Sequence, residues 1–170
     1  MSALLRTMAL GLSLALLPAA SQSQMPLQDL REVAMQLRQA IVQQDVAAVL
    51  RHVSRQRGLT CTDTPFPYAE VRRDLANKKS HLYLSLFDSA GFSKRCGNQY
   101  PPQYPAISDQ AFFAAAPDGP IEIKPLEADW ALVIFKSPVE NHYPREYNFH
   151  RESGKWKLVE GVIVGRCTCG

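Results

Sequence analysis

The sequence predicts an α+β domain in which N-terminal helices pack on a C-terminal antiparallel β-meander. The first observation is the helical spacing of apolar residues over residues 27–53. The second is a change to strand-like patterns from Trp130 onward, where β-branched and aromatic residues are frequent. The third is the Ser153-Gly154 pair between two alternating runs, which is a hairpin signal. We therefore expect the helices first along the chain and the sheet last.

Two helices are expected near the N-terminus. The first carries an apolar stripe that runs from Leu27 to Ile41. Asp45 is a suitable N-cap for the second, because its carboxylate can accept a hydrogen bond from a free backbone N–H of the first turn. The apolar pattern of this second helix begins at Val46, and we expect Gly58 to end the helix.

The middle of the chain predicts several short helices. Apolar spacing indicates one over residues 68–78. The run HLYLSLF, residues 81–87, fits a helical face but also alternates like a strand; because Ser80 can cap it and Gly91 can stop it, we interpret it as a helix. Ser108 is expected to cap a further helix over residues 109–115.

The last third of the chain predicts the strands. Residues 130–135, WALVIF, form a continuous apolar run that is typical of a central strand, so Trp130 is expected to be a buried core residue. Residues 145–151 alternate, with Tyr147 and Phe149 on the side expected to face the core. Their hairpin partner is the run over residues 156–164, and Ile121 to Lys124 can add a further strand.

Residues 1–23 have the layout of a secretory signal peptide. Arg6 precedes an apolar run that is shorter than the about 20 residues a membrane span needs, although an uncleaved anchor is an alternative interpretation. Cleavage is expected between Ala20 and Met25. The sequence thus predicts a single domain over residues 24–170, periplasmic or secreted, with no transmembrane segment after cleavage.

The cysteines of an exported chain favour disulfide bonds, and there are four: Cys61, Cys96, Cys167 and Cys169. A Cys61–Cys96 bond closes a loop of about 35 residues, but it forces Cys167 and Cys169 to bridge across one residue, against strand geometry. In the crossed pattern, Cys61 and Cys96 each bond to one tail cysteine. Metal or thiol redox chemistry at the Cys-x-Cys ending is the alternative, although the spacings match no zinc pattern and no metal or cofactor is predicted.

Candidate site residues are few, because the sequence lacks the common phosphate-binding, hydrolase and metalloprotease motifs. His150 shares a strand face with Glu146, and a histidine with a carboxylate is a general acid–base pair if that face lines a pocket. If the face is turned to solvent, the pair is only the polar side of a hairpin. His81 is a second candidate. Tyr100 and Tyr104 lie in the proline-rich run GNQYPPQYP, which suits partner recognition.

The order of elements and the hairpin YNFHRESGKWKLVEGVIV, residues 147–164, resemble the NTF2-like (cystatin-like) superfamily. The resemblance implies a curved sheet wrapped around helices, with a pocket inside the cone. The long Pro/Tyr loop and the four cysteines depart from a typical member. The superfamily includes enzymes and non-enzymatic binding domains, so the resemblance implies a fold and leaves the activity open.

The net charge and the missing motifs leave two hypotheses for the function. The formal net charge of the full chain is +3, and it is +2 without the predicted signal peptide, which carries Arg6. A charge of this size is too small to indicate nucleic-acid binding. The first hypothesis is an exported, disulfide-stabilised, non-catalytic module that binds a small ligand or a protein partner in the cell envelope. The second is a small NTF2-like hydrolase or isomerase with a histidine in a conical pocket. The missing motifs favour the first.

Overall fold

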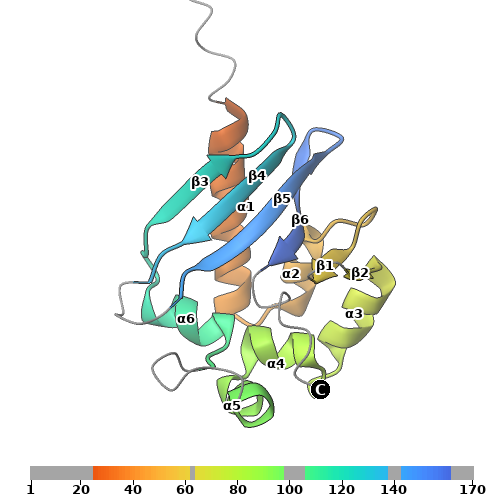
Figure 1. The fold of residues 1–170 in the computed structure, drawn as a ribbon, viewed down its shortest axis with the longest axis vertical. Helices are drawn as coiled ribbons and strands as arrows, with labels where there is room; N and C mark the ends of the chain where they lie inside the picture. The colour runs from red at the N-terminus through yellow and green to blue at the C-terminus, as the bar shows by residue number, and fades with distance from the viewer. Residues whose placement is uncertain (1–24, 62–63, 98–105, 138–142, 162–170) are drawn as a thin grey trace, which may run out of the picture.

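The computed structural model describes residues 25–61, 64–97, 106–137 and 143–161 (Figure 1). Helices precede a terminal group of strands, so the predicted α+β class is confirmed. Among the described residues, no helix is both long and apolar enough to cross a membrane. In chain order the elements are α1 (Met25–Val42), α2 (Val46–His52), β1 (Leu59–Cys61), β2 (Thr64–Phe66), α3 (Tyr68–Ala76), α4 (His81–Phe87), α5 (Ser89–Cys96), α6 (Asp109–Ala115), β3 (Ile121–Pro125), β4 (Trp130–Phe135), β5 (Arg145–Glu152) and β6 (Lys155–Gly161).

The strands form one sheet in the order β2-β1-β6-β5-β4-β3. Strands β3 to β6 make the predicted antiparallel meander, whereas β1 runs parallel to β6 and makes the sheet mixed. The register shifts between Asn148 and Phe149, where β6 holds an extra residue, and such a bulge bends the strand pair. Helix α1 crosses one face of the sheet, and α4, α5 and α6 gather at one end (Figure 1).

The main core lies between α1 and the sheet face that α1 covers. The predicted stripe of α1 is buried there against alternate residues of β4 and β5, which confirms the helical spacing and the inward side of β5. The fully buried side chains of this layer are Leu30, Leu37, Ile41, Phe135 and Phe149. A satellite cluster of Phe92, Cys96 and Ala106 lies at the end of the domain, around α5.

The predicted N-caps are confirmed, but two predicted helix ends are wrong. The side chains of Asp45, Ser80 and Ser108 each accept a hydrogen bond from the backbone of the helix that follows. Helix α2 ends at His52 rather than at Gly58, because the next residues turn toward the edge of β6. Gly91 does not stop α4; Asp88 ends it and caps α5, which contains Gly91.

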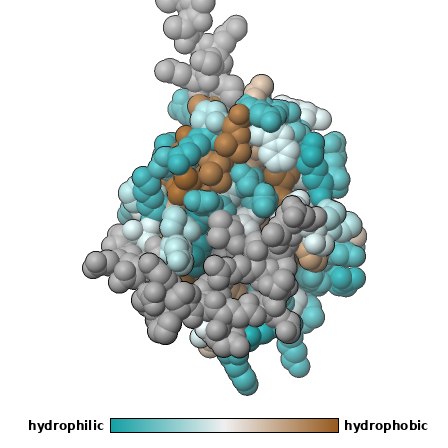
Figure 2. Space-filling view, viewed as in Figure 1, coloured by the Kyte–Doolittle hydropathy of each residue, from teal (hydrophilic) through white to brown (hydrophobic). Residues whose placement is uncertain are grey.

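The other face of the sheet is not covered by α1, and Trp130 lies on this open face. Ala131 and its alternate neighbours face the core, so Trp130, Leu132 and Ile134 point to the opposite side. Figure 2 shows apolar side chains among polar ones on this face. The expectation that Trp130 is buried in the core is wrong: its ring is half-buried beside the guanidinium of Arg57, 5.2 Å from the ring centre.

Candidate functional site

A buried polar cluster lies in the core layer between the start of α6 and strand β5. The carboxylate of Asp109, at the start of α6, is completely buried. Arg145 donates from Nε to one carboxylate oxygen over 2.6 Å, and the hydroxyl of Tyr147 donates to the other. Arg145 and Tyr147 lie two residues apart on β5 and therefore share its inward face. Arg145 also donates to the backbone carbonyl of Ile107 over 3.0 Å.

The charges of this cluster compensate one another. Burial raises the pKa of Asp109 above its usual value, while Arg145 and the hydrogen bond from Tyr147 oppose that rise. Burial and the neighbouring Asp109 raise the pKa of the Tyr147 hydroxyl well above its usual value. Tyr147 therefore keeps its proton and acts as a donor. Each group of the cluster is held by the others, which suits a structural role.

The cavity beside this cluster is too small for a substrate. It measures about 20 Å³, about the space of one water molecule. Its walls are mainly apolar side chains from α1, α2, α3 and α4, with Asp109 and Tyr147 at one side. No histidine belongs to its lining as the described residues define it.

His150 lies on the open face of the sheet, away from this cavity. Its Nε2 is 3.2 Å from an Asp129 carboxylate oxygen, and its Nδ1 is 3.7 Å from Glu152 Oε1. Its ring lies against that of Trp130, with the ring centres 4.7 Å apart. Glu152 Oε1 also accepts a hydrogen bond of 2.5 Å from the Ser54 hydroxyl. Asp129 and Glu152, which the sequence analysis did not single out, are therefore the carboxylates around His150.

The structure does not bring the other predicted catalytic residues to His150. Glu146 is half-buried on the same strand face, but four residues along a strand separate the two Cα atoms by about 13 Å. His81 lies in the first turn of α4, where its Nδ1 is 3.7 Å from Cys96 Sγ and its ring is 5.7 Å from that of Phe92. His81 thus belongs to the satellite cluster at the far end of the domain (Figure 1).

Several predicted residues lie outside the described part of the chain. These are Tyr100, Tyr104, Cys167 and Cys169, and the side chain of Cys61. Cys96 is completely buried and is disulfide-bonded, and its bonding partner is not among the described side chains. No group of three or more metal-ligating side chains occurs in the described ranges.

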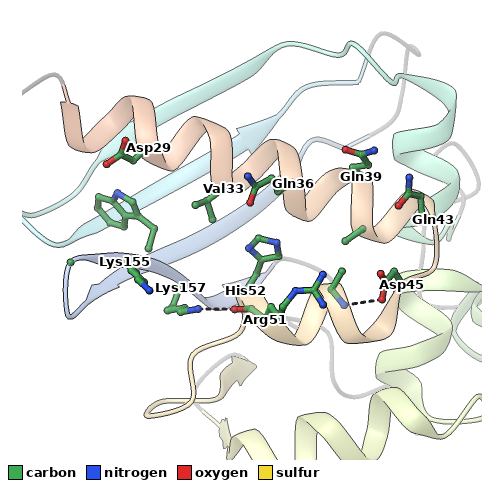
Figure 3. A pocket seen from close by; sticks show the side chains of 14 residues that line it. Asp29, Val33, Gln36, Gln39, Gln43, Asp45, Arg51, His52, Lys155 and Lys157 are labelled. Atoms are coloured by element: carbon green, nitrogen blue, oxygen red, sulfur yellow. Dashed lines mark hydrogen bonds between the residues drawn. The ribbon is translucent and has the colours of Figure 1, made fainter.

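A larger hollow lies on the surface between α1, α2 and the β5–β6 hairpin, and we call it the α1–α2 groove (Figure 3). Its volume is about 640 Å³ and it is open to solvent. Small and apolar residues form its floor, and polar or charged residues form its walls. Its lining comprises Asp29, Val33, Gln36, Gln39 and Ala40 of α1; Gln43, which follows α1; Asp45, which caps α2; Ala48, Arg51 and His52 of α2; and Gly154, Lys155, Trp156 and Lys157 of the hairpin.

The groove has a cationic wall built by α2 and β6. Lys157 donates from Nζ to the backbone carbonyl of Arg51 over 2.7 Å, at the C-terminal end of α2 (Figure 3). Burial lowers the pKa of His52 below its usual value, and Lys157 and Arg51 lower it further. Burial also lowers the pKa of Lys157; Lys155 and Arg55 add to this effect and Glu152 opposes it. The positive groups of this wall are therefore close enough to repel one another.

This cationic wall was not predicted from the sequence. Alternation in β6 does place Lys155 and Lys157 on one side of the strand, which is a readable signal. The end of α2 is about a hundred residues earlier in the chain, however, and no spacing rule connects the two segments.

Comparisons with known proteins give a likeness of fold. No protein-family model matches the chain, and no curated protein matches its sequence. A similar solved structure is an NTF-2 like protein of unknown function from Shewanella oneidensis MR-1, with 14% sequence identity and a TM-score of 0.39. The match covers 81% of this chain and 97% of that protein. The name of this neighbour agrees with the NTF2-like resemblance predicted from the sequence. The function proposed below does not depend on the match.

Proposed function

We propose that this protein is an exported, disulfide-stabilised, non-catalytic binding module that holds a protein partner in the α1–α2 groove. The observation that carries the proposal is the contrast between the interior cavity and the α1–α2 groove, as the described residues define them. The interior cavity has room for about one water molecule, while the groove offers about 640 Å³ of open space. Substrate chemistry inside the cone would need a larger opening beside a reactive group.

The groove has the composition of a recognition surface. Its floor includes the buried ring of Trp156 and small side chains such as Ala40 and Ala48, which allow a partner chain to approach closely. Its walls supply side-chain amides and cations for hydrogen bonding. Two helices and a hairpin carry these groups, so the surface is largely preformed and little ordering entropy is lost when a partner binds.

Export is supported by the sequence of the N-terminal region. The basic residue, apolar run and small residues of residues 1–23 are the three parts of a secretory signal. Intact-mass measurement of protein recovered from the periplasm of an expression host is expected to show a chain that begins between Ser21 and Met25. A mass that retains Met1 would contradict export by this route.

The binding function is tested by site-specific photo-crosslinking in intact cells. A photoreactive amino acid is placed at Gln39, which is exposed on the groove wall, or, as a matched control, at Lys78, which is exposed in the turn between α3 and α4 and is not part of the groove lining. We expect the Gln39 position to yield a protein adduct of discrete mass that disappears when Arg51→Glu is added. Equal adducts from both positions, or none from Gln39, would refute the proposed binding surface.

A further inference from the structure

We propose that the α1–α2 groove binds an acidic peptide segment in an extended conformation, with its carboxylates on the Arg51 and Lys155 wall and its backbone along the glutamines of α1. This inference rests on the proposed function, because it assigns a ligand chemistry to the same groove. It identifies the partner by the charge and shape of one of its segments.

The charges that line the groove favour an acidic ligand. Arg51, His52, Lys155 and Lys157 line one wall, and the two carboxylates of the lining, Asp29 and Asp45, lie toward opposite ends of the groove (Figure 3). Asp45 is occupied as the cap of α2, where its Oδ1 accepts a hydrogen bond from Ala48 N over 2.8 Å. Lys155 lies toward the Asp29 end, and Arg51 and His52 lie between the two carboxylates (Figure 3). At neutral pH the positive groups of this wall are therefore Arg51, Lys155 and Lys157, and the carboxylate that acts on Lys157 is Glu152, which is not part of the described lining.

The electrostatic repulsion within this wall indicates that the ligand carries negative charge. Burial lowers the pKa of both His52 and Lys157, and neighbouring cations lower both further, although Glu152 opposes this effect at Lys157. A carboxylate placed between them would favour their charged forms and would relieve the repulsion. A cationic or neutral ligand would leave the repulsion in place.

The opposite wall suits a peptide backbone. Gln36, Gln39 and Gln43 recur at helical spacing on the side of α1 that faces the groove. Each amide carries both a donor and an acceptor, which matches the alternating N–H and C=O groups of an extended chain. Gln36 donates to Glu32 over 3.2 Å, but both side chains are exposed and such a pair is readily exchanged.

The length of the groove sets the length of the ligand. From Asp29 to its last residue, Val42, helix α1 rises about 20 Å, and Gln43 follows directly. An extended peptide covers that distance with about six residues. In an extended peptide, every second side chain points to the same side. A six-residue peptide with an acidic residue at every second position would therefore place about three carboxylates on the cationic wall.

The ends of the groove argue against a nucleic acid. A phosphodiester strand is charged at every nucleotide and would pass the carboxylates of Asp29 and Asp45 where it enters and leaves. A peptide can be acidic in its middle and neutral at its ends. The observations therefore favour the peptide.

The test uses the oxidised protein purified from the periplasm and a labelled six-residue peptide of alternating glutamate and leucine, with its glutamine counterpart as control. We expect fluorescence anisotropy to show at least tenfold tighter binding of the glutamate peptide at low salt. Lys155→Glu should weaken that binding at least tenfold, whereas Lys78→Glu, an equal charge change at an exposed site outside the groove, should change it less than twofold.

A second readout is the imidazole of His52 in an NMR titration. Bound glutamate peptide should raise the pKa of His52 toward its usual value, and the glutamine peptide should not. Equal binding of both peptides, or an unchanged His52 titration, would overturn the inference. So would a single-stranded oligonucleotide that binds more tightly than the peptide and shifts the same residues. If crosslinking at Gln39 succeeds while the peptide fails, the ligand chemistry is wrong and the binding surface stands.

Discussion

At the scale of single residues, the buried cluster of Asp109, Arg145 and Tyr147 decides what the interior of the domain can do. Asp109 and Tyr147 line the small cavity, but their polar atoms are occupied by the hydrogen bonds within the cluster. The inward direction of Tyr147 could be predicted from strand alternation, and a buried phenol needs a hydrogen-bond partner. The identity of that partner could not, because Asp109 is 38 residues earlier in the chain.

Removal of the carboxylate should destabilise the domain strongly. Asp109→Ala leaves the guanidinium of Arg145 buried without its counter-charge, and loss of one partner of a buried pair costs about 3–5 kcal/mol. Tyr147→Phe, which removes one hydrogen bond to a charged acceptor and leaves the ion pair intact, should cost about 1.5–3 kcal/mol. Urea denaturation measures both. A change below about 1 kcal/mol for Asp109→Ala would show that the pair contributes little.

His52 should make stability depend on pH. Its folded-state pKa lies below the usual value of 6.5, so at intermediate pH the unfolded chain binds a proton that the folded chain does not. His52 thus contributes stability that is present above about pH 6.5 and is lost as the pH falls through its folded-state pKa. The urea midpoint should therefore drop less between pH 7.5 and 5 for His52→Gln than for the wild type. Equal drops would contradict the lowered pKa.

At the scale of elements, the sequence predicted those helices and strands whose stabilising features lie within their own segment of the chain. Helices α1, α2, α4 and α6 carry apolar spacing or caps within their own sequence, and β4 to β6 carry strand patterns and a turn. Helix α5 was missed because its sequence is polar and contains Gly91; its readable signal was Asp88, which accepts from Gly91 N over 3.0 Å. The three-residue strands β1 and β2 depend on β6, which is far away in sequence.

Gly58 should be the residue on which the β1–β2 segment depends. Its φ is +70°, and a Cβ would lie 1.9 Å from the backbone oxygen of Phe66. Gly58→Ala should therefore cost more than 3 kcal/mol, since both backbone strain and a clash with β2 oppose it. Gly154→Ala is the matched control, because its φ is +80° with nothing within 4 Å of the added Cβ, and it should cost only about 1 kcal/mol. Similar unfolding midpoints for the two variants would show that the clash is relieved by movement of β2.

At the scale of the whole molecule, the candidate site forms only when elements that are distant in the sequence come together in the fold. The α1–α2 groove exists because the β5–β6 hairpin returns beside two helices from the start of the chain (Figure 3). The sequence could predict each of these elements, whereas the compartment that residues 1–23 indicate stays a prediction. It could not predict their juxtaposition, because the separation between Arg51 and Lys157, 106 residues, carries no periodic signal.

The cysteines should connect distant parts of the same assembly. We predict that the exported protein has no free thiol and that reduction lowers the free energy of unfolding by at least about 3–4 kcal/mol, the chain-entropy value for the Cys61–Cys96 loop of about 35 residues; the longer loops of the crossed pattern give a larger value. Cys96 is completely buried at the end of α5, so its bond anchors the satellite cluster. A Cys61–Cys96 bond would tie that cluster to β1, while the crossed pattern would hold the C-terminal tail against it.

Proteolysis without reduction, followed by mass spectrometry, separates the two pairings. A linked peptide that contains Cys61 and Cys96 alone selects the first pairing. A peptide with Cys167 and Cys169 that stays joined to Cys61 or Cys96 selects the crossed pattern, which avoids the strain of a bridge across one residue. Thiol titration of the denatured, unreduced protein is the control. Two or more reactive thiols in that titration would refute the prediction that all four cysteines are paired. Metal binding or thiol redox chemistry would then be the better interpretation of the Cys-x-Cys ending.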